Sequence, residues 1–327
     1  MAPMKLRAAA LLGVAALTLT ACGSNTAAPA ESAPASSSSV TFTDNNGEHT
    51  INTPAKSVVA TDNRTFETLE AWDIKLSAGA VALMPDTISY AKDDKVVDLG
   101  SHREPNLEAI VEVAPDLIIN GQRFTQHADK ISKLAPEATI VNLDPREGEP
   151  FDKELKRQTT VLGEIFGKQA EAKALTDDFD KSVARAKAAY NKDDKVMGLI
   201  TSGGEINYSA PGSGRSVGPA FDILGLTPAL VVEDASTDHE GDDISVEAIA
   251  GSNPDWMLVL DRDGAVAADE SGYTPAADLL KKSEALANVT ASKEGNIVVM
   301  PADTYTNEGI QTYTEFFNDF ADALESK

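Results

Sequence analysis

Short apolar runs alternate with longer amphipathic segments along most of the chain. The runs lie at 57–60, 76–83, 116–120, 138–143, 196–201, 256–260 and 296–300. Runs of this length between helical patterns predict βαβ units on largely parallel sheets. Strand-like alternation over 40–52, with a turn at Asn46-Gly47, predicts a type I′ hairpin before the first unit.

The alternation stops between 151 and 191, where there is neither proline nor a strand-like run. Apolar residues there recur every three or four positions, as one face of a helix requires. They are Leu175, Phe179, Val183, Ala186 and Tyr190. We therefore expect one long connecting helix over 151–191, between an N-terminal lobe at 40–150 and a C-terminal lobe at 192–327. A last helix is expected over about 309–325.

The two halves share a motif consisting of an apolar residue, Glu-Ala-Ile, a Pro-Asp pair and an arginine at equal spacings. The first copy contains Leu107-Glu108-Ala109-Ile110, Pro115-Asp116 and Arg123. The second contains Val246-Glu247-Ala248-Ile249, Pro254-Asp255 and Arg262. In each copy a helix would end before the proline, and the arginine would follow the next strand. The sequence thus predicts an α/β fold of two similar Rossmann-like lobes joined by one long rigid helix.

The repeat also predicts where a ligand would bind. Ligands in open α/β sheets bind beyond the carboxyl ends of the strands. Arg123 and Arg262 would lie there, one on each lobe, and would face each other across a cleft. Arg215, in the loop Gly212-Ser213-Gly214-Arg215, is a third candidate cation.

The first residues have the pattern of an exported lipoprotein. Lys5 and Arg7 precede an apolar run over 8–20, and Leu19-Thr20-Ala21-Cys22 follows the pattern of a lipobox. We expect a signal peptide at 1–21 and lipidation of Cys22, the one cysteine of the chain. The small, polar residues 22–39 predict a flexible tether. The mature protein would be extracytoplasmic and anchored to the cell membrane through its lipid.

Composition narrows the function. The formal net charge of -24 argues against binding nucleic acid. An intrachain disulfide would need a second cysteine, so the core must be stable without one. An anionic ligand would therefore depend on a local cluster of arginines.

Together, the lipobox, the two lobes, the connecting helix and the repeated motif resemble the cluster A (class III) substrate-binding proteins of ABC importers, over residues 40–327. The resemblance is strongest to the binders of ferric catecholate siderophores. It implies a monomer with no enzymatic activity and no intrinsic cofactor. The expected partners are a ferric siderophore as ligand and an ABC transporter permease.

The same resemblance implies site residues. Arg123, Arg215 and Arg262 would surround the anionic complex. His239 and Tyr305 would line the cleft and are candidate ligands of ferric iron, although an extra residue after His239 departs from the usual spacing. Tyr208 is a weaker candidate for the wall.

Two further residues are implied as contacts to the permease. Glu108 and Glu247 occupy matched positions on short helices of the two lobes. In the family, one surface glutamate per lobe docks onto the permease.

Two alternatives remain open. The same fold could carry haem, cobalamin, or a hydroxamate or carboxylate siderophore. A lipid-tethered cell-wall hydrolase would instead need a buried Ser89–Lys92 pair, from the motif Ser89-Tyr90-Ala91-Lys92.

Overall fold

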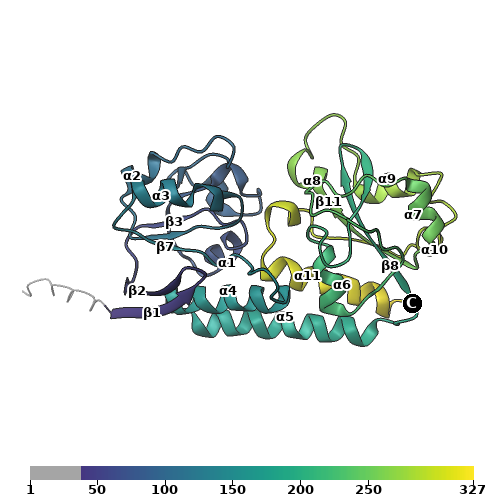
Figure 1. Cartoon of the computed structure of the whole chain (residues 1–327), viewed down its shortest axis with the longest axis horizontal. Helices are drawn as coiled ribbons and strands as arrows, with labels where there is room; N and C mark the ends of the chain where they lie inside the picture. Colours follow the sequence, from purple (N-terminus) through teal and green to yellow (C-terminus); the bar gives the residue numbers. More distant parts are fainter. Residues whose placement is uncertain (1–37) are drawn as a thin grey trace, which may run out of the picture. The chain divides into compact units, whose positions relative to one another are not determined.

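Two separate, mainly parallel sheets divide the protein into two lobes, as the alternation of apolar runs predicts (Figure 1). The computed structural model describes residues 38–327. The predicted signal peptide, Cys22 and most of the predicted tether lie outside the described residues. Ser38 and Ser39, assigned to the tether, are the first residues of β1 (Ser38–Asp44). No helix within the described range is both long and apolar enough to cross a membrane.

A hairpin of β1 and β2 (Gly47–Thr53) precedes the first sheet, as predicted. The prediction of its turn is wrong by one residue. Asp44 pairs with Gly47, so Asn45 and Asn46 form the turn. The Asp44 carboxylate accepts hydrogen bonds from the backbone N–H groups of Asn46, at 2.7 Å, and Gly47, at 3.0 Å. Gly47 has a φ of 128°, which glycine adopts readily.

Within residues 38–327, the N-terminal lobe is built on a five-stranded parallel sheet of order β5-β4-β3-β6-β7. Its strands are β3 (Val58–Ala60), β4 (Leu76–Gly79), β5 (Val97–Asp98), β6 (Leu117–Ile119) and β7 (Thr139–Val141). Its helices are α1 (Phe66–Ala71), α2 (Ala109–Val113) and α3 (Ala128–Leu134), with the 3-10 turns η1 (Val81–Leu83), η2 (Ser89–Lys92) and η3 (Gln122–His127).

The sheet of the C-terminal lobe has the order β10-β8-β11-β12, with β9 paired antiparallel to β8. Its strands are β8 (Lys195–Ser202), β9 (Glu205–Tyr208), β10 (Thr227–Pro228), β11 (Trp256–Asp261) and β12 (Ile297–Val299). The helices are α6 (Gly218–Leu224), α7 (Val246–Ser252), α8 (Arg262–Val266), α9 (Ala276–Lys282), α10 (Thr290–Glu294) and α11 (Ile310–Glu325), with the turn η4 (Thr304–Thr306). The last helix thus confirms the prediction over 309–325.

The segment 151–191 is two helices, which corrects the prediction of one. α4 (Phe151–Phe166) ends at Gly167, whose φ of 67° is left-handed, and α5 (Gln169–Ala189) begins two residues later. The periodic apolar pattern did not reveal this break because glycine can end a helix without changing the apolar face. α5 packs against α4 and α11, and Phe179 on its predicted apolar face is fully buried 5.9 Å from the ring of Phe317.

The repeated motif corresponds to a repeated joint between helix and strand. α2 is followed by Ala114 and α7 by Asn253, both left-handed, with φ of 41° and 46°. Asp116 then accepts the backbone N–H of Lys56 at 2.8 Å, beside the start of β3. Asp255 accepts that of Lys195 at 2.7 Å, at the start of β8. The Pro-Asp pairs therefore join each helix to the neighbouring strand in the same way in both lobes.

Candidate functional site

Three guanidinium groups surround the aromatic ring of Tyr305. The central carbons of Arg123, Arg215 and Arg262 lie 4.9, 4.5 and 5.2 Å from the centre of the ring. These distances are within the range of cation–π attraction. Tyr305 lies in η4, just after β12, and is only 4% exposed. We call these four residues the arginine–tyrosine cluster.

The arginines come from both lobes. Arg123 lies in η3, which follows β6 in the N-terminal lobe, and Arg262 is the first residue of α8, directly after β11. Both therefore lie beyond the carboxyl ends of their strands, where the sequence placed them. Arg215 is held by a tightly packed loop, because a Cβ on Gly214 would lie 2.4 Å from the backbone nitrogen of Ala210.

The three arginines differ in their anionic partners. Arg215 pairs with Glu308 at 2.9 Å, and Arg262 pairs with Glu240 at 3.2 Å and with Asp263 at 3.4 Å. Burial, together with the neighbouring charge of Arg215, lowers the pKa of Arg123. An added anion would relieve this repulsion.

Hydrogen-bond donors remain free in the cluster. Within residues 38–327, Nη2 of Arg123 and the Nε atoms of Arg215 and Arg262 are buried without a hydrogen-bond partner. Buried polar groups in proteins are usually bonded, so these three donors suit an acceptor that the chain itself does not supply.

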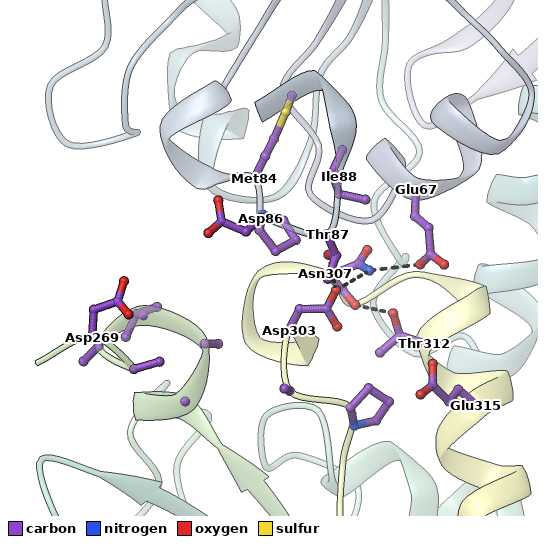
Figure 2. A pocket seen from close by; sticks show the side chains of 18 of the residues that line it. Glu67, Met84, Asp86, Thr87, Ile88, Asp269, Asp303, Asn307, Thr312 and Glu315 are labelled. Carbon is purple, nitrogen blue, oxygen red and sulfur yellow. Dashed lines mark hydrogen bonds between the residues drawn. The ribbon is translucent and has the colours of Figure 1, made fainter. Parts of the chain in front are cut away.

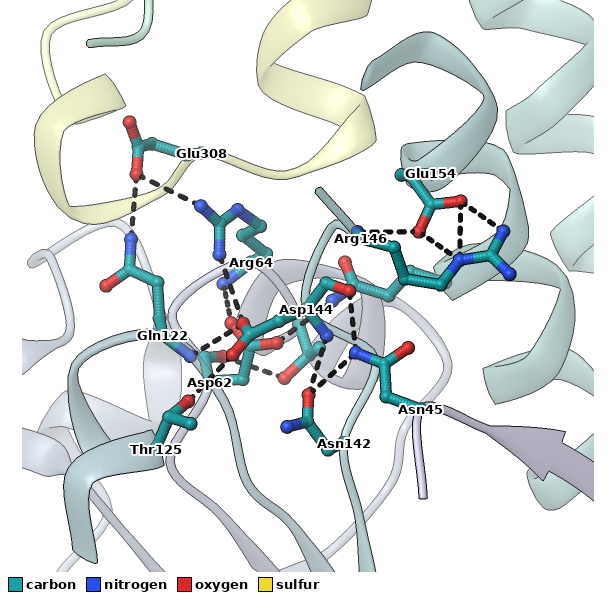
Figure 3. A network of polar contacts seen from close by, with 12 residues as sticks. Asn45, Asp62, Arg64, Gln122, Thr125, Asn142, Asp144, Arg146, Glu154 and Glu308 are labelled. Atoms are coloured by element: carbon teal, nitrogen blue, oxygen red, sulfur yellow. Dashed lines mark hydrogen bonds and ion pairs between the residues drawn. The ribbon is translucent and has the colours of Figure 1, made fainter. Parts of the chain in front are cut away.

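Glu308 connects the cluster to the N-terminal lobe. Its carboxylate accepts a hydrogen bond from Nε2 of Gln122 at 2.7 Å and lies 4.0 Å from Arg64 (Figure 3). Burial raises the pKa of Glu308, but Arg215 and Arg64 outweigh it, so the pKa is lowered and the carboxylate stays charged. Arg64 also contacts Asp144 at 3.4 Å.

Sequence reasoning missed Arg64 and Glu308. Arg64 follows β3 in the same way that Arg123 follows β6, so the rule of an arginine just beyond a strand would have found it. Glu308 had no such signal, because its partners are distant in sequence and meet it only in the fold.

The segment around Tyr305 follows the last strand of the C-terminal lobe and is hydrogen-bonded to the N-terminal lobe. Nδ2 of Asn63 donates to the Thr306 carbonyl at 2.9 Å, and Nδ2 of Asn307 donates to Glu67 at 2.9 Å. Asn63 and Glu67 belong to the N-terminal lobe, whereas η4 follows the last strand of the C-terminal lobe. The cluster therefore lies where the two lobes meet.

His239 lies beside the cluster despite the extra residue that follows it. Its ring centre is 6.5 Å from that of Tyr305, and its side chain is 41% exposed. Nε2 lies 3.7 Å from the Glu240 carboxylate, and Nδ1 lies 3.5 Å from Asp238. The structure thus brings together His239, Tyr305 and all three predicted arginines.

Tyr208 lies away from the cleft that it was predicted to line. It is 1% exposed within the core of the C-terminal lobe, and its hydroxyl donates to the Leu230 carbonyl at 2.9 Å. The prediction that it lines the cleft is wrong in this structure. The sequence placed it in a loop after a strand, whereas it is the last residue of β9 and its side chain points into the core.

Two cavities lie near η4. The smaller, of about 400 Å³, is lined from both lobes by residues that include Arg64, Gln122, Glu308 and two arginines of the cluster, Arg123 and Arg215. The larger, of about 740 Å³, is acidic, with Glu67, Asp303 and Glu315 in its wall (Figure 2). Burial and neighbouring carboxylates raise the pKa values of Glu67 and Glu315. An anion would be repelled there, so the arginine side of η4 is the better candidate.

The remaining predicted residues lie on the surface. Glu108 is exposed directly before α2, and Glu247 is exposed in the first turn of α7, one on each lobe. Ser89 and Lys92 are also exposed, and Nζ of Lys92 donates to the Asp86 carbonyl at 2.9 Å. This is not the buried serine–lysine pair that the hydrolase alternative requires.

The sequence of the chain is similar to those of known binding proteins. The chain is 29% identical over 286 residues to the petrobactin-binding protein YclQ of Bacillus subtilis, covering 86% of each chain. It is 27% identical over 265 residues to the ferric-anguibactin-binding protein FatB of Vibrio anguillarum, covering 80% of this chain and 79% of that protein.

The fold is also similar to those of solved substrate-binding proteins. The crystal structure of YclQ superposes with a TM-score of 0.74 at 25% identity, over 89% of this chain and all of that one (100%). The periplasmic catecholate-siderophore-binding protein VctP of Vibrio cholerae shares the fold, with a TM-score of 0.73 at 24% identity, over 89% of this chain and 100% of that one. Residues 58–304 match the family described as periplasmic binding protein, and the chain belongs to that family.

Proposed function

We propose that this protein binds an anionic ferric siderophore, of catecholate or mixed type, between its two lobes and delivers it to an ABC permease for iron uptake. The observation that carries the proposal is the cluster of Arg123, Arg215 and Arg262 around Tyr305, with donors from both lobes. The names of its relatives, which bind petrobactin and ferric anguibactin, support the same ligand class.

The charge of the ligand fits the cluster. A ferric tris-catecholate carries about three negative charges, and a guanidinium offers fixed donors, a permanent charge and a flat face for aryl rings. One charge pair at about 4 Å contributes about 4 kcal/mol at an effective dielectric near 20, before desolvation. The net charge of -24 comes mainly from surface carboxylates. Salt screens the repulsion between these carboxylates and a ligand at the site once they are more than about 8 Å apart.

Tyr305 and His239 have a second proposed role. A siderophore with fewer than six donor atoms leaves iron positions open, and phenolate and imidazole are both suitable ligands for iron in proteins. The ring separation of 6.5 Å leaves His239 and Tyr305 close enough to share one metal ion between them. The partly exposed side chain of His239 can adjust to reach it.

Delivery requires a partner and a location. Glu108 and Glu247, exposed at the starts of the two corresponding helices, are the proposed contacts to the permease. Lipidation at Cys22 would hold the protein at the cell membrane, outside the cytoplasm. Binding and release would leave the covalent bonds of the siderophore unchanged, so the proposed role is not enzymatic.

A fluorescence titration tests the ligand class. Trp72 and Trp256 are both buried, and their emission would be quenched by a bound ferric complex. The protein would be titrated with a ferric catecholate, a ferric hydroxamate and haem. We expect the ferric catecholate to bind most tightly. Millimolar binding of ferric catecholates together with tight binding of haem would overturn the proposal.

A further inference from the structure

The carboxylate of Glu240 lies beside the arginine–tyrosine cluster. Oε1 of Glu240 lies 3.2 Å from Nη2 of Arg262 and 3.7 Å from Nε2 of His239. Both of these partners face the ring of Tyr305. The carboxylate therefore occupies groups that an anionic ligand would use.

Glu240 differs from Glu308, the carboxylate that pairs with Arg215, in how easily it can leave. The side chain of Glu308 is 6% exposed and is fixed by contacts from both lobes, whereas that of Glu240 is 49% exposed. An exposed ion pair contributes little and is readily exchanged for water. Glu308 is thus a permanent partner of Arg215, and Glu240 is a removable partner of Arg262.

Only the side chain of Glu240 needs to move. Its carbonyl accepts a hydrogen bond from Nδ2 of Asn207 at 2.8 Å, and its N–H donates to Asp238 at 2.8 Å. The next residue, Gly241, has a φ of 84°, and a Cβ there would lie 2.9 Å from the Tyr208 carbonyl oxygen. The backbone is therefore anchored to β9 while the carboxylate reaches into the site.

We infer that Glu240 is a specificity residue of the proposed siderophore site: its carboxylate occupies Arg262 and His239 in the free protein and is displaced by an anionic ferric complex. This inference rests on the proposed function. The displacement lowers affinity, and a carboxylate that stays nearby repels the ligand in proportion to its negative charge. Glu240 would therefore select against the most highly charged ferric complexes.

The variant Glu240→Gln tests this, because it keeps the size of the side chain and removes the charge. Two probes are titrated by tryptophan quenching: a ferric tris-catecholate, which is a trianion, and a neutral ferric tris-hydroxamate. We expect the variant to bind the trianion about fivefold more tightly, the upper end of what an exposed ion pair contributes. Its affinity for the neutral complex should stay unchanged.

Glu233→Gln is the matched control, since Glu233 is an exposed glutamate earlier in the same segment. It should leave both affinities as they are. An equal gain in the control would show a general effect of net charge and would overturn the inference. Weaker binding by Glu240→Gln would also overturn it, because Glu240 would then contact the ligand or the iron.

The double variant Glu240→Gln with Arg262→Ala separates two effects of Glu240: its ion pair with Arg262 and its repulsion of the anionic ligand. The part of the gain that comes from freeing Arg262 should disappear when Arg262 is absent, and the part that comes from repulsion should remain. An undiminished fivefold gain would overturn the assignment of Arg262 as the occupied partner. Failure of the proposed function gives a different result, since the unaltered protein would then not bind the ferric tris-catecholate.

Discussion

Arg215 contacts Tyr305 in two ways at once. Its guanidinium carbon lies 4.5 Å from the centre of the phenol ring, and its Nη2 lies 3.3 Å from the Tyr305 carbonyl oxygen, to which it donates a hydrogen bond. The same nitrogen pairs with Glu308. Arg215 therefore fixes both the ring and the backbone of the segment that carries it, and it does so at the junction of the lobes.

This arrangement makes Arg215 sensitive to substitution. We expect Arg215→Ala to weaken binding of an anionic ferric catecholate by about 1–3 kcal/mol, the scale of a lost hydrogen bond to a charged group. Arg215→Lys should restore only part of the affinity, because an ammonium lacks the planar fork. Fluorescence titration measures both.

Arg185→Ala is a control for this series, since Arg185 pairs with Asp322 and Glu325 on the surface. Its binding should equal that of the unaltered protein. Arg123→Ala and Arg262→Ala should weaken binding to a similar degree as Arg215→Ala. Unchanged affinity in all three cluster variants would refute a role for the arginines in binding.

The two tyrosines should separate binding from stability. Tyr305→Phe keeps the ring for cation–π contacts and removes the hydroxyl, so ferric complexes with four donor atoms should lose affinity and their phenolate-to-iron absorption. Tyr208→Phe loses only its hydrogen bond to Leu230, which should lower the free energy of unfolding by about 1 kcal/mol and leave binding unchanged. Visible spectroscopy and denaturant unfolding distinguish the two variants. A loss of binding in Tyr208→Phe alone would reverse these assignments.

Glu154 should make stability depend on acid pH. Burial raises its pKa, but hydrogen bonds from Arg146 and Arg157 outweigh burial and lower the pKa to about 2, from an ordinary value of 4.5. The unfolded chain thus binds this proton first, so the contribution is present above pH 4.5 and is lost as pH falls toward 2. Glu154→Gln should reduce the free energy of unfolding by about 2–3 kcal/mol at pH 7.

Unfolding by urea at several pH values measures this. The difference between Glu154→Gln and the unaltered protein should shrink as pH falls through that window. Glu171→Gln provides a surface control, because Glu171 is exposed and pairs only with the partly exposed Lys168. A difference that stays constant with pH would mean that the Glu154 carboxylate is not stabilised by its charge.

Glu108 and Glu247 should act on delivery and not on binding. Both side chains are exposed, at matched places on the two lobes. We expect Glu108→Ala combined with Glu247→Ala to bind the ferric complex normally and to impair iron uptake by cells. Glu112→Ala with Glu294→Ala offers a comparison of equal charge. Normal uptake by the first double variant would contradict the docking role.

Cys22 should determine where the protein resides. We expect Cys22→Ala to abolish labelling by a fatty-acid probe and to move the protein from the membrane fraction to the soluble fraction. Ligand binding should be unaffected, because the described body of the protein begins after this residue. Unchanged fractionation would argue against the lipid anchor.

The sequence alone was sufficient for the two-lobed α/β fold and for the positions of most strands. Apolar runs such as 116–120 and 256–260 became β6 and β11, because a strand buried on both faces needs a continuous apolar stretch. The repeated motif also placed Arg123 and Arg262 beyond those strands. These features depend on residues close together in the chain.

Tertiary structure decided what depends on distant residues. Gly167 divides 151–191 into two helices, and the packing of β9 buries Tyr208 in the core. Glu308 pairs with Arg215 and approaches Arg64 because the two lobes meet there, and no local pattern signals such a contact. Local periodicity therefore determined the elements and the ends of the strands, whereas charge pairing and burial across the lobes determined which side chains form the site.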